Sequence, residues 1–188
     1  MNTLAQYLQK QGNIAIIPTD TVYGVVARAA DPQAVERLYT LKQRESKPGT
    51  LVAADIDQLV AIGIKRQQLL GADVFWPGAV SIITTCGHNL RYLHQGIGSL
   101  AVRIPDDPWL LDLLRHTGPL LTSSANQPGQ PPATTVAEAK NYFGDQIAWY
   151  QDGGVVDREP STVIRIINSK VEVVRFGAVT FDTSGKNQ

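Results

Sequence analysis

Cysteine is nearly absent from this sequence of 188 residues, which contains the single residue Cys86. One cysteine excludes an internal disulfide and a zinc site built from several thiolates. Long hydrophobic runs are also absent, since no apolar stretch approaches the roughly 18–20 residues that a membrane-spanning helix needs. The N-terminal stretch MNTLAQYLQKQGN is polar throughout and has no signal-peptide cleavage pattern. These absences predict a soluble, cytoplasmic protein without a membrane partner.

Net charge is absent too, because 17 Lys and Arg residues balance 17 Asp and Glu residues. A neutral chain is not a general binder of polyanions. The basic residues are nevertheless unevenly distributed, and the stretch LKQRESKPGT holds Lys42, Arg44 and Lys47 within a few residues of one another. A local cationic site is therefore compatible with the neutral sum.

Several familiar functional motifs are missing. The chain has neither a Walker A phosphate loop nor the G-x-S-x-G elbow that presents a catalytic serine. The stretch GIGSLA (96–101) matches the dinucleotide-binding pattern, but that motif must open a helix, and the residues that follow predict a strand. His88, His94 and His116 lack metal-ligand spacing. We predict structural or surface roles for these histidines and no metal bound by protein side chains.

Hydrophobic periodicity predicts alternating strands and helices first and a strand-rich last third. Strands are expected at 13–17, 50–54, 79–86, 99–105, 119–126, 146–150, 162–167 and 170–176. Helices are expected at 31–44, 55–62, 65–75, 106–118 and 134–144. The fold class is α/β (α+β-like), a twisted mixed sheet with flanking helices. With no linker, repeat or low-complexity tract, residues 1–188 are expected to form one domain, with its core at about 14–177 and a tail at 178–188.

The expected helices carry recognisable start signals. Asp31 is placed to cap a helix that Pro32 opens, and Asp55 is placed to cap the next one. Thr135 and Glu138 fit the spacing of a capping box.

Polar residues gather where three of the expected strands end. They are Thr19, Asp20, Thr21 and Tyr23 after the first strand, Arg103 in SLAVRIP, and Thr122, Ser123, Ser124 and Asn126 in PLLTSSAN. Ligands of open α/β sheets bind outside the carboxyl ends of strands. We therefore expect the three groups to converge. Together with the cations of LKQRESKPGT, these residues suit a site that binds a nucleoside triphosphate without a phosphate loop. The hydroxyl groups can bind phosphate oxygens or a small amino acid.

Each group taken alone has a purely structural interpretation. Ser and Asn after a strand often close a turn, and Thr19 and Asp20 have the same interpretation. Arg103 could be a surface side chain, and Lys42 and Arg44 complement the dipole at a helix C-terminus. Only the combination indicates a binding site.

The combination resembles a known family. The stretches PTDTVYG, KQRESKP, WPGAVS, SLAVRIPDDP, TSSANQPGQPP and PSTVIR…VVRFG occur in the order and spacing of the YrdC-like family. The resemblance covers about residues 14–177, and the length is similar to that of the short single-domain bacterial form, the TsaC type. It implies a mixed sheet with a large concave basic cavity.

The resemblance also implies an activity. Enzymes of this kind are threonylcarbamoyl-AMP synthases, which are nucleotidyltransferases. They form threonylcarbamoyl-AMP and pyrophosphate from L-threonine, bicarbonate and ATP, with Mg²⁺ expected on the ATP phosphates. A tRNA-modifying protein complex then transfers the threonylcarbamoyl group to the adenosine beside the anticodon.

The site residues that the resemblance implies fall into two sets. The ATP set, of which Lys42 and Arg44 are also implied to be catalytic, is Lys42, Arg44, Lys47, Ser99, Ser124, Asn126 and Arg175. The L-threonine set is Thr21, Arg103, Thr122 and Ser161.

The chain departs from the family pattern at loops expected near the substrate. Lys47 falls one residue early, the stretch 48–54 lacks a histidine found in some relatives, and Ala79 and Pro128 replace the usual residues of WPGPxT and SANxSG. Two alternatives remain at this stage. One is an RNA-binding module, possible because the implied basic cavity could take RNA, with a steep salt dependence. The other is a related enzyme that uses carbamoyl phosphate.

Overall fold

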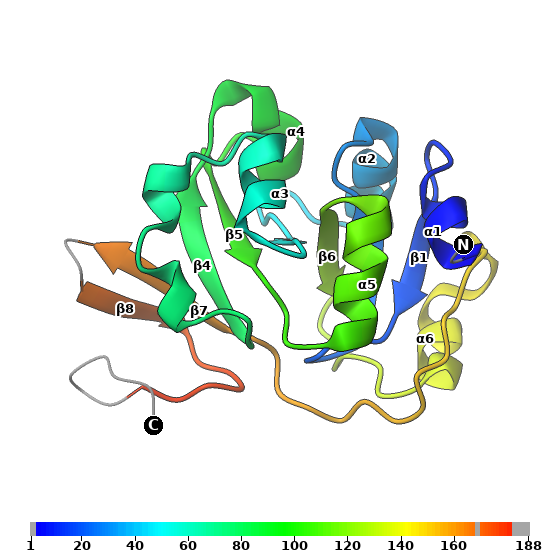
Figure 1. Ribbon diagram of the computed structural model, residues 1–188. Coiled ribbons are helices and arrows are strands. Elements are labelled where there is room, and N and C mark those ends of the chain that lie inside the picture. Colours follow the sequence, from blue (N-terminus) through cyan, green and yellow to red (C-terminus); the bar gives the residue numbers. More distant parts are fainter. Residues whose placement is uncertain (1–2, 168–169, 182–188) are drawn as a thin grey trace.

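One mixed sheet organises the residues that the structure, a computed structural model, describes, namely 3–167 and 170–181. Its eight strands lie in the order β1-β2-β6-β3-β5-β4-β7-β8 (Figure 1). They are β1 (Ile14–Ile17), β2 (Gly24–Arg28), β3 (Thr50–Val52), β4 (Val80–Thr85), β5 (Ser99–Arg103), β6 (Leu120–Ser124), β7 (Thr162–Ile167) and β8 (Lys170–Arg175). β3 pairs with β5, and β4 with β7, in parallel, and the other neighbours are antiparallel. The prediction of a mixed sheet in one domain is confirmed.

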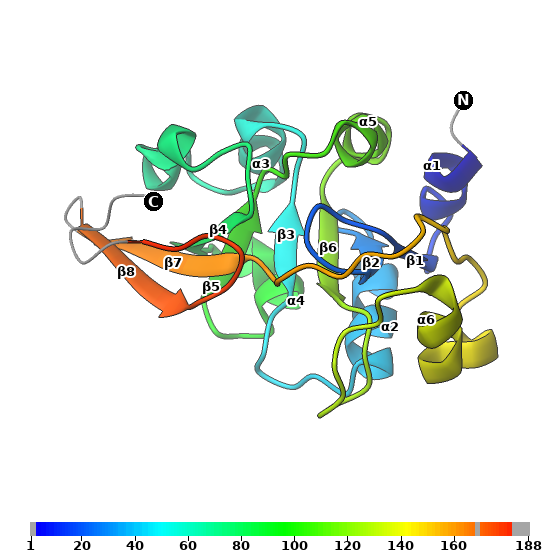
Figure 2. The same cartoon turned by 90° about the horizontal axis from the view of Figure 1, so that it is seen from below.

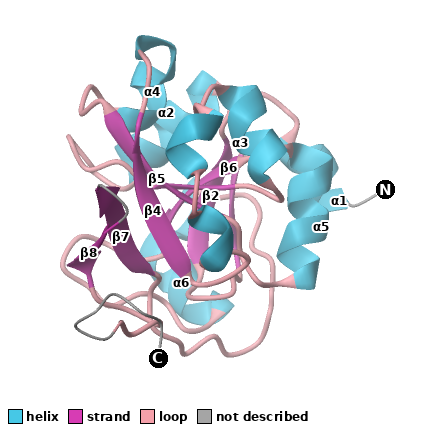
Figure 3. Ribbon diagram, turned by 60° about the vertical axis from the view of Figure 1, so that its left-hand side comes forward, coloured by secondary structure: helices cyan, strands magenta, loops and turns pink. Residues whose placement is uncertain are grey.

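Helices cover both faces of this sheet. They are α1 (Thr3–Leu8), α2 (Pro32–Leu41), α3 (Ile56–Ile62), α4 (Arg91–His94), α5 (Pro108–Thr117) and α6 (Val136–Phe143). Figure 2 shows α1, α3 and α5 along one face and α2, α4 and α6 along the other, and Figure 3 shows the same layers coloured by secondary structure. No helix in the described part of the chain has the length and apolar character to cross a bilayer.

Because helices lie on both faces, the strands between them are apolar on both sides, even at the β1 edge of the sheet. All residues of β1 are buried, as are the first residues of β2. On the α1 and α5 face, Leu4 and Leu8 pack with Leu110 and Leu114 over Ile17. A fully buried leucine contributes about 2 kcal/mol through removal of its surface from water. This core holds the polar strand ends in fixed positions.

The helix starts follow the sequence signals. Asp31 Oδ1 accepts hydrogen bonds from the backbone N–H groups of Gln33 (3.0 Å) and Ala34 (3.2 Å), and Pro32 opens α2. Asp55 caps α3 as predicted. The hydroxyl of Thr135 caps α6 by accepting from the N–H of Glu138, as predicted. The reciprocal bond of the capping box is shifted by one residue, because the carboxylate of Glu138 accepts from the N–H of Thr134 and not from that of Thr135.

Two elements lie outside the sequence expectations. The sequence predicts no strand between 17 and 31, yet residues 24–28 form β2, which pairs with β1 and β6. Its short apolar run does not distinguish a strand from a connection until both neighbours are known. The N-terminal stretch forms α1, because Leu4, Ala5 and Leu8 lie on one face that packs beside α5.

Two other predicted elements were wrong. The helix expected at 65–75 is two 3₁₀ turns, Arg66–Leu69 and Ala72–Val74, separated by Gly71, whose φ of 77° is left-handed. The strand expected at 146–150 is reduced to a single bridge between Ile16 and Tyr150.

The start of the expected tail is packed against the domain. The backbone N–H of Ala178 donates to the carbonyl of Pro160 (2.8 Å), and the hydroxyl of Thr162 donates to the carbonyl of Val179 (2.6 Å). The ring of Phe181 lies edge-on to Phe75. The rest of the expected tail, 182–188, lies outside the described residues.

Asp31 offers a test of how local capping contributes to stability. Besides its two bonds within α2, its Oδ2 accepts from the N–H of Gly12 (2.7 Å). Asp31→Ala therefore removes three hydrogen bonds, and we expect the free energy of unfolding to fall by about 2 kcal/mol. Asp55→Ala, which removes the hydrogen bond from the N–H of Gln58 to the Asp55 carboxylate at the start of α3, should cost about 1 kcal/mol. Urea denaturation measures the unfolding free energy of both variants. A loss in Asp55→Ala that equals or exceeds the loss in Asp31→Ala would contradict the prediction.

Candidate active site

Polar residues from separate stretches of chain line a cavity of about 150 Å³. The loop after β1 contributes Thr19 and Thr21, β5 contributes Arg103, and β6 contributes Thr122 and its neighbours. The three groups that the sequence placed at strand ends thus converge. Arg44, Ser161 and Arg175 also line this cavity, which we call the inner cavity.

A second cavity of about 260 Å³ adjoins the first, and we call it the outer cavity. Its lining includes Lys42, Lys47 and Asn126. Arg44, Ser123 and Ser124 belong to both linings, so the two cavities share a wall. None of the described residues that line either cavity is an aspartate or a glutamate. The pair therefore forms a site with excess positive charge.

Lys42 joins α2 to the loop that follows β6. Its Nζ donates to the carbonyl of Ser124 (2.8 Å), to Oδ1 of Asn126 (2.7 Å) and to the carbonyl of Asn126. The same Oδ1 accepts from the hydroxyl of Ser124 (2.8 Å). Lys42 is only 6% exposed, and burial, with the nearby charge of Arg44, lowers the pKa of its ammonium to about 8. All three donors of this ammonium already have acceptors.

The ring of Phe143 adds a further contact to this ammonium. Nζ of Lys42 lies 5.7 Å from the ring centroid, within the range of a cation–π interaction. Lys42 is thus stabilised as a cation on several sides, and it fixes the loop that carries Ser124 and Asn126.

Arg44 and Arg175, which are far apart in the sequence, both contribute positive charge to the inner cavity. Nη1 of Arg44 donates to the hydroxyl of Ser123 (2.8 Å). Nη2 of Arg175 donates to the carbonyl of Ser161 (2.6 Å) and lies 3.3 Å from its hydroxyl. Desolvation lowers the pKa of both guanidinium groups, and the charges of Arg44 and Arg103 lower that of Arg175 further. The guanidinium of Arg175 therefore lies within range of electrostatic repulsion from Arg44 and Arg103.

Arg103 differs from the other cations because it is already paired. Its Nη1 lies 2.5 Å and 2.6 Å from the two carboxylate oxygens of Asp20, and the two side chains are 3% and 6% exposed. The Nε of Arg103 is buried and has no hydrogen-bond partner among the described residues. The backbone N–H of Asp106 also approaches Asp20, at 3.3 Å. This ion pair joins the loop after β1 to the last residue of β5.

Glycine allows the chain to come close around Thr122. A Cβ on Gly24 would lie 2.6 Å from the hydroxyl of Thr122, and one on Gly49 would lie 2.5 Å from its carbonyl. Both contacts are too short for any side chain, so these glycines are required for the close approach. Thr122 is thereby held at the centre of the inner cavity wall.

The remaining predicted residues divide between the cavities and elsewhere. Ser161 lines the inner cavity, and its hydroxyl lies 2.9 Å from that of Ser81. Thr21 lies in the same cavity, where its hydroxyl is 3.0 Å from that of Thr19. Ser99 lies elsewhere: it pairs with Thr85 of β4 and lines a separate cavity of about 460 Å³. The structure does not bring Ser99 to the other predicted residues.

Sequence reasoning missed the part that Asp20 takes in the site. The sequence assigned Asp20 to turn chemistry, whereas its carboxylate pairs with Arg103, a residue 83 positions away. No local pattern signals a pairing at that separation. The interpretation of Thr19 as turn chemistry is confirmed, because its hydroxyl accepts from the N–H groups of Thr21 and Val22.

Comparison with known proteins shows the family. The family model Sua5_yciO_yrdC, described as "Telomere recombination", matches residues 7–177. The chain is 35% identical over 171 residues to the threonylcarbamoyl-AMP synthase of Pseudoalteromonas translucida, with 86% of this chain and 90% of that protein covered. It is 33% identical over 177 residues to that of Photobacterium profundum, with 88% and 94% covered. The chain belongs to the Sua5/YciO/YrdC family.

Solved structures agree with this assignment. Sua5 of P. abyssi, in its complex with L-threonine, matches with a TM-score of 0.83 and 28% identity. The match covers 94% of this chain and 53% of that one, so the chain spans about half the length of this relative. E. coli YciO shares the fold, with a TM-score of 0.79, 23% identity, and 93% of this chain and 87% of that chain covered.

The buried pair of Asp20 and Arg103 should be costly to break. Asp20→Asn keeps the shape but leaves a buried guanidinium without its counter-charge, so we expect the free energy of unfolding to fall by about 3 kcal/mol. Urea denaturation measures the change. The matched control is Asp57→Asn, which breaks the ion pair with Arg66 on the surface (side chains 83% and 59% exposed) and should cost less than about 1 kcal/mol. An equal loss of unfolding free energy in the two variants would show that the buried ion pair stabilises the protein no more than the exposed one.

Proposed function

We propose that this chain is a threonylcarbamoyl-AMP synthase, a nucleotidyltransferase that joins L-threonine, bicarbonate and ATP into threonylcarbamoyl-AMP and pyrophosphate. The observation that carries the proposal is the pair of adjoining cavities that share Arg44. The inner cavity is small and combines hydroxyls with arginines, and the outer cavity is larger and adds Lys42 and Lys47, which suits two ligands that must react with each other. The names of the relatives and the threonine complex of Sua5 support it.

The inner cavity is proposed to bind L-threonine. Thr21, Thr122 and Ser161 supply hydroxyls that can donate to or accept from an amino acid. Arg103 supplies the guanidinium for the carboxylate, and its unpartnered Nε indicates donor capacity that the protein does not use. A cavity of about 150 Å³ is of a size for a small amino acid and too small for a nucleotide.

The outer cavity is proposed to bind the triphosphate. Lys47 is exposed in its lining, and Arg44 can reach the phosphates from the wall that it shares with the inner cavity. Lys42 contributes its charge and holds Ser124 and Asn126, whose polar groups border the nucleotide. Arg175, which lines the inner cavity, is proposed to reach the phosphate nearest the threonine. Ser99 is not included, because it lines a separate cavity.

The chemistry needs orientation and charge in place of a protein nucleophile. The threonine amine forms a bond to the carbon of bicarbonate, and water is lost, which gives a carbamate. A carbamate oxygen then forms a bond to the α-phosphorus of ATP, and the bond to the β-phosphate oxygen breaks, so that pyrophosphate leaves with its electron pair. Catalysis of such a transfer rests on positioning and on stabilisation of phosphate charge. Arg44, at the shared wall, is placed to stabilise charge on the reacting phosphate.

Mg²⁺ is proposed to enter with ATP. The described residues contain no group of three or more His, Cys, Asp or Glu side chains that could hold a metal ion. The oxygens of the triphosphate would therefore be its main ligands, and the ion would neutralise charge on the leaving pyrophosphate.

The protein is proposed to release its product to a tRNA-modifying protein complex. The product is a mixed anhydride that water hydrolyses, so a transferring enzyme must take it up quickly. The cationic lining also leaves open weak RNA binding, which would show a steep salt dependence and no pyrophosphate release.

Pyrophosphate release tests the proposed function directly. With ATP, bicarbonate and Mg²⁺, the protein should release pyrophosphate when L-threonine is added, and far less with L-serine or L-alanine. A coupled phosphate assay measures the rate, and the adenylate is identified by mass spectrometry. Release that does not depend on an amino acid, or none at all, would refute the assignment. Release that requires carbamoyl phosphate would support the related enzyme class instead.

The two subsites predict different kinetic effects of two arginine substitutions. Arg44→Ala should lower kcat/KM at least tenfold, which is about 1.4 kcal/mol of transition-state stabilisation. Arg103→Met, which keeps much of the buried volume, should raise the KM for threonine more than the KM for ATP. Steady-state kinetics with each substrate varied in turn measures both. The reverse order for Arg103→Met would mean that the two subsites are exchanged.

A further inference from the structure

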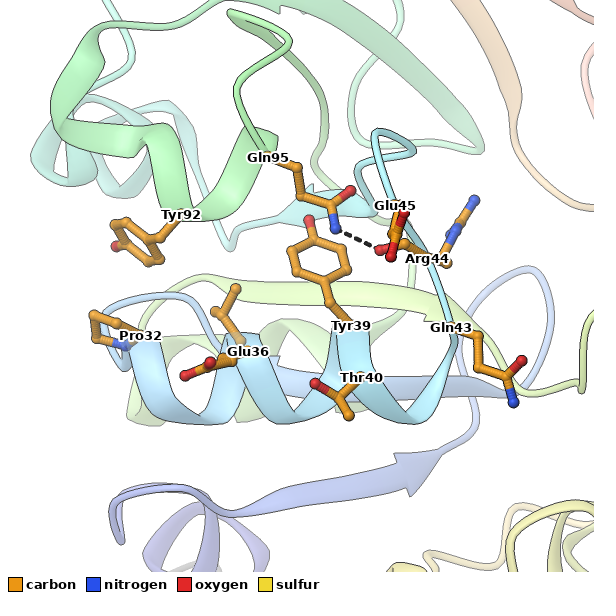
Figure 4. A pocket seen from close by; sticks show the side chains of 10 residues that line it. Pro32, Glu36, Tyr39, Thr40, Gln43, Arg44, Glu45, Tyr92 and Gln95 are labelled. Carbon is orange, nitrogen blue, oxygen red and sulfur yellow. Dashed lines mark hydrogen bonds between the residues drawn. The ribbon is translucent and has the colours of Figure 1, made fainter.

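A side chain outside both cavities holds the loop that carries Arg44 and Lys47. Oε1 of Gln95 accepts from the backbone N–H of Lys47 (3.0 Å), and its Nε2 donates to the carbonyl of Arg44 (2.6 Å). Figure 4 shows Gln95 reaching this loop from the segment after α4, across the groove between α4 and α2. Gln95 lines neither cavity. Of the two residues that it holds, Arg44 lines both cavities and Lys47 lines the outer one.

The loop needs such a support because its backbone is strained. Gln43 (φ 47°) and Ser46 (φ 52°) are both in the left-handed region although neither is glycine. Residues with a Cβ adopt this region at a cost and remain there only when surrounding contacts hold them. The two bonds from Gln95 are made to the backbone between and after these residues. They oppose the relaxation of the loop toward ordinary conformations.

Gln95 is itself held in place by the turn around it. Nδ1 of His94 accepts from the backbone N–H groups of Gly96 and Gly98 (3.1 Å each). These bonds require a neutral ring with its proton on Nε2, which then donates to the carbonyl of Gly87 (3.3 Å). His94 is only 4% exposed, and Gly96 (φ 86°) and Gly98 (φ 79°) supply the left-handed backbone that the turn needs. The GIG stretch, which matched a dinucleotide motif, thus builds a rigid platform.

We propose that Gln95 is a positioning residue that keeps the Arg44–Lys47 loop in its ATP-binding conformation, a role that rests on the function proposed above. It touches no substrate. Its carboxamide fixes one carbonyl and one N–H of the loop, and through them it fixes where the guanidinium of Arg44 meets Ser123. When the carboxamide is removed, the loop has other conformations available, and the bound one becomes a smaller fraction of the total.

The test compares Gln95 with another glutamine that makes the same two kinds of bond. Oε1 of Gln58 accepts from the N–H of Ala54, and its Nε2 donates to the carbonyl of Leu114, both at 2.9 Å and outside the two cavities. Gln95→Met fills much of the same space without the hydrogen bonds, and Gln58→Met is the matched control. Gln95→Ala is a second variant that does not depend on how methionine packs.

The measurements are the Kd of a non-hydrolysable ATP analogue by calorimetry, the KM values for ATP and threonine, and the melting temperature. Gln95→Met and Gln95→Ala should weaken analogue binding and raise the KM for ATP roughly tenfold, as expected from the loss of two supporting hydrogen bonds. The KM for threonine should change less than about twofold, because the residues proposed to contact threonine (Thr21, Arg103, Thr122 and Ser161) lie on other segments of the chain. Gln58→Met should lower the melting temperature and leave analogue binding unchanged.

Folded Gln95 variants that bind the analogue as tightly as the wild type would overturn the proposal. Equal weakening in the Gln58 variant would also overturn it, since general destabilisation would then explain the effect. A wild type that neither binds the analogue nor releases pyrophosphate would refute the proposed function, and this positioning role with it. In the first two outcomes the wild type still shows threonine-dependent release, so the failures are distinguishable.

Discussion

Positive charge concentrated in a small space is the constraint on which the site depends. Lys42, Arg44, Arg103 and Arg175 all lie around two adjoining cavities in a chain with no net charge. Burial and mutual repulsion would drive such groups apart or toward neutrality, and the lowered pKa values of Lys42 and Arg175 express this. The fold offsets that tendency with an acceptor for each cation: carbonyl oxygens, serine hydroxyls or the carboxylate of Asp20. An anionic ligand would relieve the repulsion further, so binding and stability should be coupled.

The acceptors also explain why distant segments meet. Lys42 ties α2 to the loop after β6, Arg103 ties β5 to the loop after β1, and Arg175 ties the end of β8 to Ser161 at the start of β7. The first two ties join elements that are far apart in the sequence, and the third closes the open end of the β7–β8 hairpin. The interactions that hold the cations are thus the same ones that close the walls of the cavities.

Sequence signals worked where their cause is local. Asp31 and Asp55 cap helices because the capping oxygen and the N–H groups lie within three residues, which a short pattern can show. The helix predicted at 65–75 is interrupted within the segment by Gly71, whose left-handed φ the apolar pattern does not show. The role of Asp20 depends on a partner 83 residues away, which no short pattern can show. Ser99 shows the limit of motif transfer, since it shares the stretch SLAVR with Arg103 yet lines a separate cavity.

The pairing of Arg103 suggests how the two cavities divide their ligands. An arginine neutralised by Asp20 adds little net attraction for an anion, but it still presents directed donors. That combination matches an amino acid, which carries no net charge and has a carboxylate to orient. A triphosphate carries several negative charges and requires unpaired cations, which the outer cavity supplies through Arg44 and Lys47 together with Lys42. The carboxylate of Asp20 thereby makes Arg103 an orienting group with little net charge, whereas Arg44 and Arg175 line the same inner cavity and extend its positive charge toward the outer cavity. Arg44 stands where the two meet, and that is where a bond between the two ligands would form.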